Sequence, residues 1–347
     1  MDAGVRGRGV TALVIGANGY LGSHVTRQLV ADGQDVRVMV RPTATTIGID
    51  DLKVTRFLGD IWDDGALREA MAGCDVVYYC VVDTRGWLRD PAPLFHTNVA
   101  GTRNVLEIAT EPAIAASLKR FVFTSSYATV GRRRGHTATE DDTASERGLP
   151  PYVQSRVQAE KLVLSYARER GLPAVAMCVS TTYGAGDWGR TPHGAIIAGA
   201  AFGKLPFVMD KIELEAVGVT DAARAMILAA EHGRIGERYL ISDKMISNAE
   251  VVRIAAEAAG VAPPTKKMPL PMSYALAIAG SIKARLRGTD EQLSMGSLRL
   301  MRAEAPVDHG KAVRELGWEP RPVEESIREA AQFWAGLRDA RRKSKAG

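Results

Sequence analysis

Residues 11–33 read "TALVIGANGYLGSHVTRQLVADG", which is an apolar run, a glycine-rich loop and an amphipathic segment in succession. The first five residues are apolar or β-branched and predict a buried strand, and the helical spacing that follows ends at Gly33. Between them, Gly16, Gly19 and Gly22 form the pattern G-x-x-G-x-x-G. Glycines at a strand–helix junction let a phosphate approach backbone N–H groups, where the helix dipole attracts the anion. The stretch therefore predicts a dinucleotide-binding loop, in which Asn18, Tyr20 and Leu21 also contact the cofactor.

The end of the next predicted strand indicates which dinucleotide is bound. The strand "DVRVMV" (35–40) runs into Arg41, and no carboxylate stands at its end. A carboxylate there would hydrogen-bond the ribose 2′-OH of NAD, whereas an arginine accommodates the 2′-phosphate of NADP. We therefore expect NADP(H) to be favoured, with NAD(H) as the alternative.

Strand-like and helix-like segments alternate through the first half of the chain. This order predicts βαβ units and the α/β class, with a doubly wound parallel Rossmann sheet. The expected strands are 11–15, 35–40, 54–58, 75–82, 120–126 and 174–180, and the expected helices are 19–33, 63–73, 98–110 and 153–170. Continuous Val, Ile and Phe runs fit strands that are buried on both faces.

The second half is less regular and predicts a smaller, interleaved C-terminal substrate lobe. We expect a dinucleotide-binding domain over 9–183, to which 216–243 returns. The remaining ranges, 184–215 and 244–336, are assigned to the substrate lobe, and 337–347 to a basic tail.

Bulk composition narrows the class of protein. The chain has 347 residues, 46% of them hydrophobic, and no apolar run approaches the roughly 18 residues that span a bilayer. The N-terminus lacks a secretory apolar region, and the three cysteines suit neither a disulfide framework nor a metal site. We expect a cytoplasmic protein without a metal.

A net charge of +5 raises the question of nucleic acid. The basic residues cluster in "GRRRG" (131–135) and in "RDARRKSK" (338–345), and the latter is most simply a solvated end. We expect no nucleic-acid partner.

Several further segments resemble the extended (atypical) short-chain dehydrogenase/reductases, over nearly the whole chain. They are the glycine loop, "GDI" (59–61), "NVAGTRNVLEIA" (98–109), "FVFTSS" (121–126), "GVTDAARAMILA" (218–229) and "LGWEPRPVEESIREA" (316–330). The most similar branch holds 3β-hydroxysteroid dehydrogenases and dihydroflavonol reductases. The resemblance implies that Asp60 contacts the adenine amino group, with Ile61 packed nearby, and that Val81 and Val179 approach the nicotinamide.

The motif "YVQSR" (152–156) carries the expected chemistry. By resemblance, Tyr152 is the proton donor, Ser126 orients the carbonyl and Arg156 is the cation that serves cofactor and tyrosine. A free tyrosine has a pKa of about 10 and needs a nearby cation to work near neutrality. Residues four apart share one face of a helix, so positions 152 and 156 are neighbours.

The sequence departs from the family in ways that leave alternatives open. The family has lysine where this chain has Arg156, which keeps the charge but not the lysine's hydrogen-bond geometry. Cys178-Val179 replaces a common Arg-Pro pair, and Val81-Val82 replaces small residues. We therefore predict an NADP(H)-dependent oxidoreductase that interconverts a bulky hydrophobic ketone or aldehyde and its alcohol. The alternatives are a sugar-nucleotide epimerase or dehydratase, for which Arg190, Lys204 and Lys211 offer cations, and a non-catalytic NADP(H)-binding protein.

The substrate lobe gives weaker signals. Expected wall residues are Asp83, Trp87, Tyr183 and Trp188. Residues 270–288 form an apolar helix that is buried, a lid, or placed on a membrane surface, and the first two are favoured. By analogy with the family, the helices at 98–110 and 153–170 are expected to form a homodimer interface.

Overall fold

The computed structural model describes residues 10–131, 135–145, 148–209, 211–290, 295, 298 and 305–346. The arginines at 132–134 of the expected basic cluster lie outside the described residues, as do residue 9 and Gly347, the outer limits of two predicted ranges.

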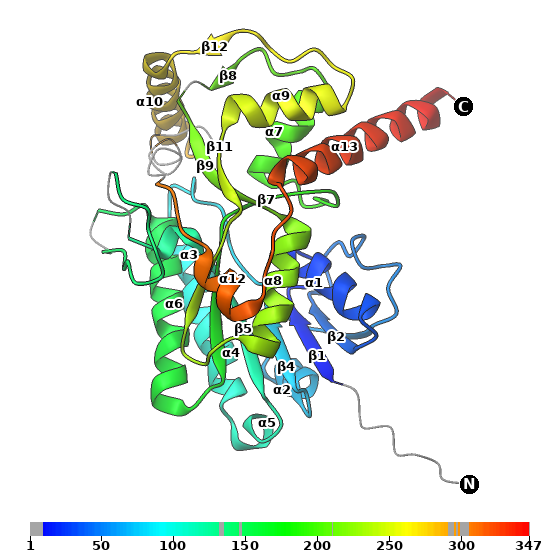
Figure 1. The fold of residues 1–347 in the computed structure, drawn as a ribbon, viewed down its shortest axis with the longest axis vertical. Coiled ribbons are helices and arrows are strands. Elements are labelled where there is room, and N and C mark those ends of the chain that lie inside the picture. The colour runs from blue at the N-terminus through cyan, green and yellow to red at the C-terminus, as the bar shows by residue number, and fades with distance from the viewer. Residues whose placement is uncertain are drawn as a thin grey trace.

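A seven-stranded parallel sheet forms the larger part of the molecule, in the order β10-β6-β5-β4-β1-β2-β3 (Figure 1). The strands are β1 (Thr11–Ile15), β2 (Asp35–Val40), β3 (Thr55–Leu58), β4 (Val76–Tyr79), β5 (Arg120–Ser126), β6 (Ala174–Val179) and β10 (Arg238–Ile241). The order reverses between β1 and β4, which is the doubly wound arrangement that the alternating pattern predicts. The expected fold class is confirmed.

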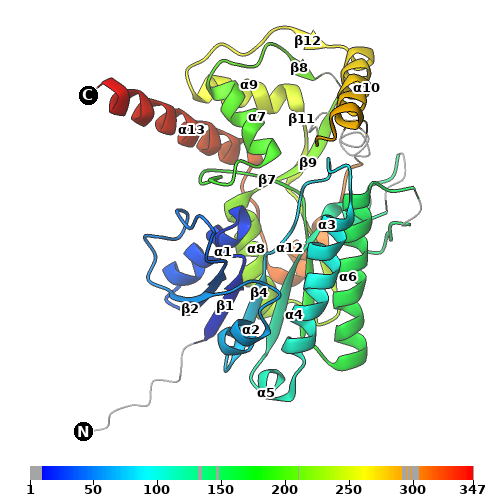
Figure 2. The same ribbon diagram turned by 180° about the vertical axis from the view of Figure 1, so that it is seen from behind.

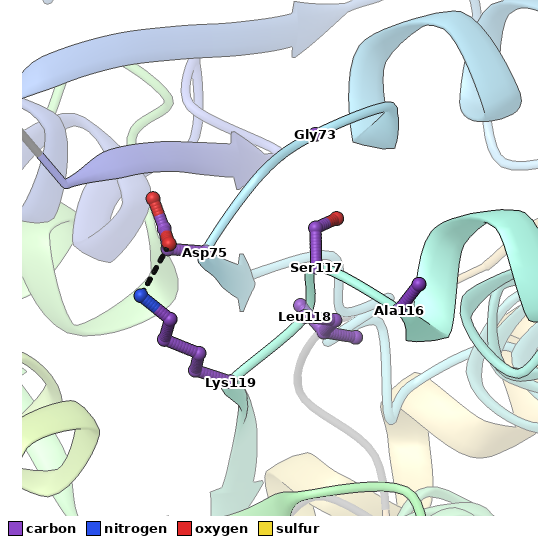
Figure 3. Close-up of a pocket in the computed structure, with 6 residues that line it drawn as sticks. All are labelled: Gly73, Asp75, Ala116, Ser117, Leu118 and Lys119. Atoms are coloured by element: carbon purple, nitrogen blue, oxygen red, sulfur yellow. Dashed lines mark ion pairs between the residues drawn. The ribbon is translucent and has the colours of Figure 1, made fainter. Parts of the chain in front are cut away.

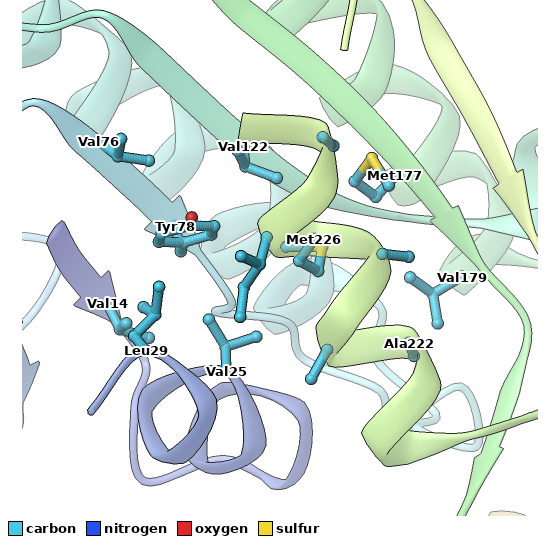
Figure 4. Packing of buried hydrophobic residues seen from close by; sticks show 14 of the residues in the cluster. Val14, Val25, Leu29, Val76, Tyr78, Val122, Met177, Val179, Ala222 and Met226 are labelled. Atoms are coloured by element: carbon cyan, nitrogen blue, oxygen red, sulfur yellow. The ribbon is translucent and has the colours of Figure 1, made fainter. Parts of the chain in front are cut away.

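Helices cover both faces of this sheet. They are α1 (Tyr20–Ala31), α2 (Asp64–Met71), α3 (Ala92–Phe95), α4 (Thr102–Ala109), α5 (Pro112–Ala115), α6 (Pro151–Arg170) and α8 (Val219–His232), with a short 3₁₀ turn η2 (Tyr127–Thr129). Alternate residues of β1 enter different cores: Val14 packs with α1 and α8, whereas Leu13 packs with α2, α4 and α6. Figure 4 shows the first of these cores, with Met226 of α8 facing Tyr78 of β4 and Val122 of β5.

The helix expected over 98–110 begins differently. Residues His96–Gly101 form a π-helical turn, η1, before the regular helix α4 starts at Thr102. π-turns of this kind accommodate an extra residue and are frequent at functional sites. Here the turn holds Asn98, which is completely buried.

The smaller lobe lies beyond the edge at which the parallel strands end, as the two opposite views show (Figures 1 and 2). It contains β7 (Thr181–Tyr183), β8 (Val208–Met209), β9 (Glu213–Gly218), β11 (Lys244–Ser247), β12 (Lys267–Met268), α7 (Pro192–Ala201), α9 (Asn248–Ala258), α10 (Leu270–Arg287) and α13 (Val323–Ala346). Strands β11, β9 and β7 form one small sheet, and β12 pairs with β8. No helix of the described residues is long and apolar enough to cross a bilayer.

One segment assigned to the smaller lobe packs elsewhere. Helix α12 (Gly310–Leu316) and the fully buried Trp318 belong to the core between the large sheet and α8. The Trp318 Nε1–H donates to the carbonyl of Asp221 at 2.9 Å, which fixes this return. Part of the range 244–336 therefore packs on the larger domain. The indole of Trp318 finds an apolar site there and a hydrogen-bond acceptor on α8.

Two helical glycines, Gly22 and Gly336, test how closely the glycine loop packs against α1. A Cβ at Gly22 would lie 2.3 Å from the carbonyl oxygen of Gly16, whereas a Cβ at Gly336 of α13 would meet nothing within 4 Å. We expect Gly22→Ala to lower the free energy of unfolding by about 1–3 kcal/mol and to weaken dinucleotide binding, because the loop must move. Gly336→Ala should instead stabilise by up to about 1 kcal/mol. Urea unfolding and a fluorescence titration measure both effects, and equal behaviour of the two variants would contradict the close packing at Gly22.

Candidate active site

The glycine loop forms a backbone cradle at the start of α1. Gly16 has φ +86°, and a Cβ there would lie 3.0 Å from the Val81 side chain and 3.1 Å from the carbonyl carbon of Cys80. The helix begins after Gly19, and no side chain caps it. Backbone N–H groups at a helix start that lack a side-chain cap suit an anion. The structure thus brings the predicted residues Gly16, Gly22 and Val81 together.

The end of β2 borders this loop, and β3 lies on the other side of β2. The Gly16 N–H donates to the Met39 carbonyl at 3.2 Å, which joins the glycine loop to the end of β2. The exposed Arg41 is the first residue after this strand. Asp60 is half-buried, and one of its carboxylate oxygens accepts the Trp62 N–H at 2.8 Å. Ile61 is buried against η1, where a Cβ at Gly101 would lie 2.2 Å from its Cδ1.

Two consecutive serines at the end of β5 point in different directions. The Ser125 hydroxyl donates to the buried Glu160 carboxylate of α6. The Ser126 Oγ accepts the Ala128 N–H at 3.2 Å, which leaves its own proton available for donation. Ser126 is the register neighbour of Val179 on β6, so these two predicted residues lie side by side.

Tyr152 is the second residue of α6, and its position depends on a buried hydrogen-bond chain. Its ring packs beside Ala128, and its carbonyl accepts the Ser155 hydroxyl at 2.7 Å. Asn98 donates to the Ser155 oxygen at 3.0 Å, and the Asn98 amide oxygen accepts the Asp83 N–H at 2.8 Å. These hydrogen bonds thus join the loop after β4 to the first turn of α6.

Arg156 lies one turn after Tyr152 and is completely buried. Its Nη2 donates to the Thr124 carbonyl, and its guanidinium carbon stands 5.2 Å from the centre of the Phe123 ring. Burial lowers the pKa of Arg156, and the neighbouring Tyr152 and Tyr79 act in the opposite direction. The guanidinium remains charged at any ordinary pH.

Two nitrogens of this guanidinium have no partner among the described residues. They are Nε and Nη1, and the hydroxyl of the nearly buried Ser180, just beyond β6, is likewise unpartnered. A buried donor without an acceptor costs about 1–3 kcal/mol, more when it is charged. A dinucleotide bound across the end of the sheet would bring ribose hydroxyls as acceptors. The glycine cradle and these orphaned donors therefore fit such a cofactor.

Glu160 and Arg238 form a buried ion pair that sequence reasoning missed. The Arg238 Nη1 stands 2.8 Å from the Glu160 carboxylate, which also accepts the Thr129 hydroxyl at 2.8 Å and the Cys178 thiol at 3.1 Å. Burial and then this carboxylate raise the pKa of the Cys178 thiol, which therefore stays a donor. Arg238 also donates to the carbonyls of Glu140 and Asp142. The pair thus anchors the segment that leads into Tyr152.

Most of the residues expected to form the wall of the substrate pocket contact other side chains of the protein or are buried. The Asp83 carboxylate pairs with Arg85 at 2.6 Å, and the Trp188 ring meets the Phe333 ring edge-on at 4.8 Å between centres. Tyr183 is buried, and Trp87 is half-buried.

Tyr20, which the sequence predicts to contact the cofactor, makes a hydrogen bond within the protein. Its hydroxyl donates to the Gly184 carbonyl at 2.8 Å and ties the loop after β7 to α1. The three cations weighed for a sugar nucleotide, Arg190, Lys204 and Lys211, are all exposed.

A surface hollow of about 340 Å³ lies at the opposite edge of the sheet (Figure 3). Gly73, Asp75 and the segment 116–119 line it, and Asp75 pairs with Lys119 at 2.8 Å. These residues precede β4 and β5, whereas open parallel sheets place ligands at the carboxyl ends of their strands. We therefore assign no catalytic role to this hollow.

The sequence profile of the NAD dependent epimerase/dehydratase family matches residues 12–242. The chain belongs to this family. Within it, the expected extended short-chain dehydrogenase/reductase type is confirmed, as is the enzyme class, an oxidoreductase acting on CH–OH groups.

Three relatives cover nearly the whole chain. A Synechocystis sp. protein with the provisional name dihydroflavonol 4-reductase is 28% identical, over 92% of this chain and 93% of its own. Sterol demethylase protein B of Methylococcus capsulatus is 27% identical, over 94% of this chain and 98% of its own. The crystal structure of gox2253 is 32% identical, with a TM-score of 0.81 over 94% of this chain and 98% of that one.

The contribution of the buried pair Glu160–Arg238 to stability can be measured by substitution. Removing one partner of a buried pair leaves an uncompensated charge, so we expect Arg238→Met to lower the free energy of unfolding by about 3–5 kcal/mol. Glu160→Gln combined with Arg238→Met should cost less than the single change, because the stranded charge is gone. The exposed pair Arg253–Glu257 is the matched control, and Arg253→Met should cost at most about 1 kcal/mol in the same urea titration. Equal losses for the two arginine variants would contradict a buried, coupled pair.

Proposed function

We propose that this protein is an NADP(H)-preferring reductase or dehydrogenase that interconverts a bulky hydrophobic ketone or aldehyde and its alcohol. The observation that carries the proposal is the buried Arg156, one turn after Tyr152 on α6, with two nitrogens that no described residue satisfies. A bound nicotinamide supplies or accepts the hydride in this chemistry.

The protein's own residues handle the substrate oxygen. Tyr152 gives a proton to the alkoxide that forms when a carbonyl is reduced, and takes it back in the reverse direction. Ser126 donates its free hydroxyl proton to the same oxygen and orients the carbonyl. Arg156 holds a permanent positive charge beside the phenol, and its Thr124 contact fixes the direction of the guanidinium.

Two observations support this reading over its alternatives. The curated relatives reported above carry the names of a dihydroflavonol reductase and a sterol demethylase protein, and three of the expected wall residues, Trp87, Tyr183 and Trp188, are aromatic. The cations required for a sugar diphosphate are exposed and come from separate segments. A binder without chemistry would show NADPH affinity but no turnover with any member of a carbonyl panel.

The role of Tyr152 is tested by removing its hydroxyl. Tyr152→Phe should lower kcat by about 10²–10⁴-fold, because the proton donor is lost, while NADPH affinity stays within about twofold. Tyr166→Phe is the matched control at the far end of α6, where the hydroxyl donates to Glu107 and not to the site. NADPH oxidation with a panel of cyclic and steroid-like ketones measures both. Full activity of Tyr152→Phe would show that another group donates the proton.

The cofactor preference is tested at Arg41. Arg41→Glu should shift the ratio of NADPH to NADH affinity toward NADH by about 10–100-fold, because a charge-assisted hydrogen bond to phosphate becomes a repulsion. Lys53→Glu makes the same charge change at another exposed position and should leave the ratio unaltered. If Arg41→Glu leaves the ratio of NADPH to NADH affinity unchanged, Arg41 does not bind the 2′-phosphate.

A further inference from the structure

Helix α10 exposes its large apolar side chains. Met272, Leu276, Ile278, Ile282 and Leu286 are between 40% and 80% exposed. The side chains that it buries are small: Ser273, Ala277 and Ala284. The expectation of a buried helix is therefore wrong, because Tyr274 and these small residues make the contact with the lobe while five large aliphatic or Met side chains face outward.

This concentration of apolar surface is local. Five of the twelve large hydrophobic side chains that are exposed among the described residues lie on α10. The others are spread over the remainder of the described chain, mostly one to an element, and single exposed residues of that kind need no explanation. A contiguous apolar patch instead marks an interaction surface.

Cations flank the apolar row. In a helix with 3.6 residues per turn, Met272, Ala279 and Leu286 follow one line along the outer face. Arg285 then lies on one side of this line and Arg287 on the other, and both are exposed. The segment 270–287 contains no aspartate or glutamate. An apolar row bordered by long basic side chains is the pattern of a helix that lies in a lipid interface, where the cations extend to the headgroups.

We propose that α10 docks on an anionic lipid bilayer, with its axis parallel to the surface and Met272, Ile282 and Leu286 in the acyl boundary. A second copy that docked through its own α10 would offer the same cations and no carboxylate, so lipid phosphates complement this face better than such a dimer does. Figures 1 and 2 both place α10 at the outer side of the smaller lobe.

The docking helix is connected to the candidate site. Just beyond α10, the Asp290 carboxylate accepts the Arg89 N–H at 2.9 Å, from the loop that carries Trp87. An apolar substrate dissolved in the bilayer would therefore be released beside the site wall. This consequence rests on the proposed function, whereas the docking itself does not.

Flotation with vesicles tests the docking without substrate or cofactor. The full-length protein should bind phosphatidylglycerol–phosphatidylcholine vesicles, and bind phosphatidylcholine vesicles at least about tenfold more weakly. Ile282→Ser with Leu286→Ser should lower the partition coefficient at least about tenfold, because the buried apolar area is lost. Arg285→Gln with Arg287→Gln should lower it on anionic vesicles and remove most of its salt dependence.

Two matched controls separate this face from the rest of the surface. Ile235→Ser removes an exposed apolar side chain elsewhere, and Arg253→Gln with Arg314→Gln removes two exposed charges elsewhere. Both should bind vesicles like the unaltered protein. Absence of binding to anionic vesicles would overturn the proposal, and so would binding that the α10 variants do not weaken. The protein could instead form a dimer, bind no vesicles, and become monomeric in the variant Ile282→Ser with Leu286→Ser. That result would assign the face to a second copy of the chain and would also overturn the proposal. Loss of NADPH turnover in any variant bears on the proposed function and not on docking.

Discussion

A charged guanidinium that is fully buried and only partly hydrogen-bonded is the constraint on which this site depends. Arg156 satisfies one nitrogen at the Thr124 carbonyl and leaves two without a partner among the described residues. Such a group is costly in the free protein, and a ligand with acceptor oxygens at the end of the sheet lowers that cost. Under the proposed function, this buried charge therefore favours binding of the cofactor.

The surrounding network keeps this charge in position. Glu160 and Arg238 hold the segment before α6 to the edge of the sheet, and Asn98 joins the loop after β4 to Ser155 of α6. Both links act on the helix that carries Tyr152 and Arg156. Because buried polar networks are stable only when each member is satisfied, they fix one orientation of α6.

The sequence predicts the large sheet well and the polar network poorly. Strand 120–126 and the glycine loop agree with their predicted positions, because continuous apolar runs and strand-loop-helix spacing allow few other structures. Asn98, Glu160 and Arg238 gave no periodic signal, and Glu160 and Arg238 are 78 residues apart, so only the folded chain shows that they meet. The apolar character of 270–288 predicted a helix, but which face is buried depends on neighbours that no local pattern encodes.

The most direct test of this account compares the free and cofactor-bound stability of Arg156→Met with that of the unaltered protein. We expect the variant to lose little stability in the absence of cofactor, since it removes an unsatisfied buried charge, yet to bind NADPH at least about tenfold more weakly. Urea unfolding with and without NADPH gives both numbers. A large loss of free-state stability with unchanged NADPH affinity would show that Arg156 is only a structural cation, and would contradict the account.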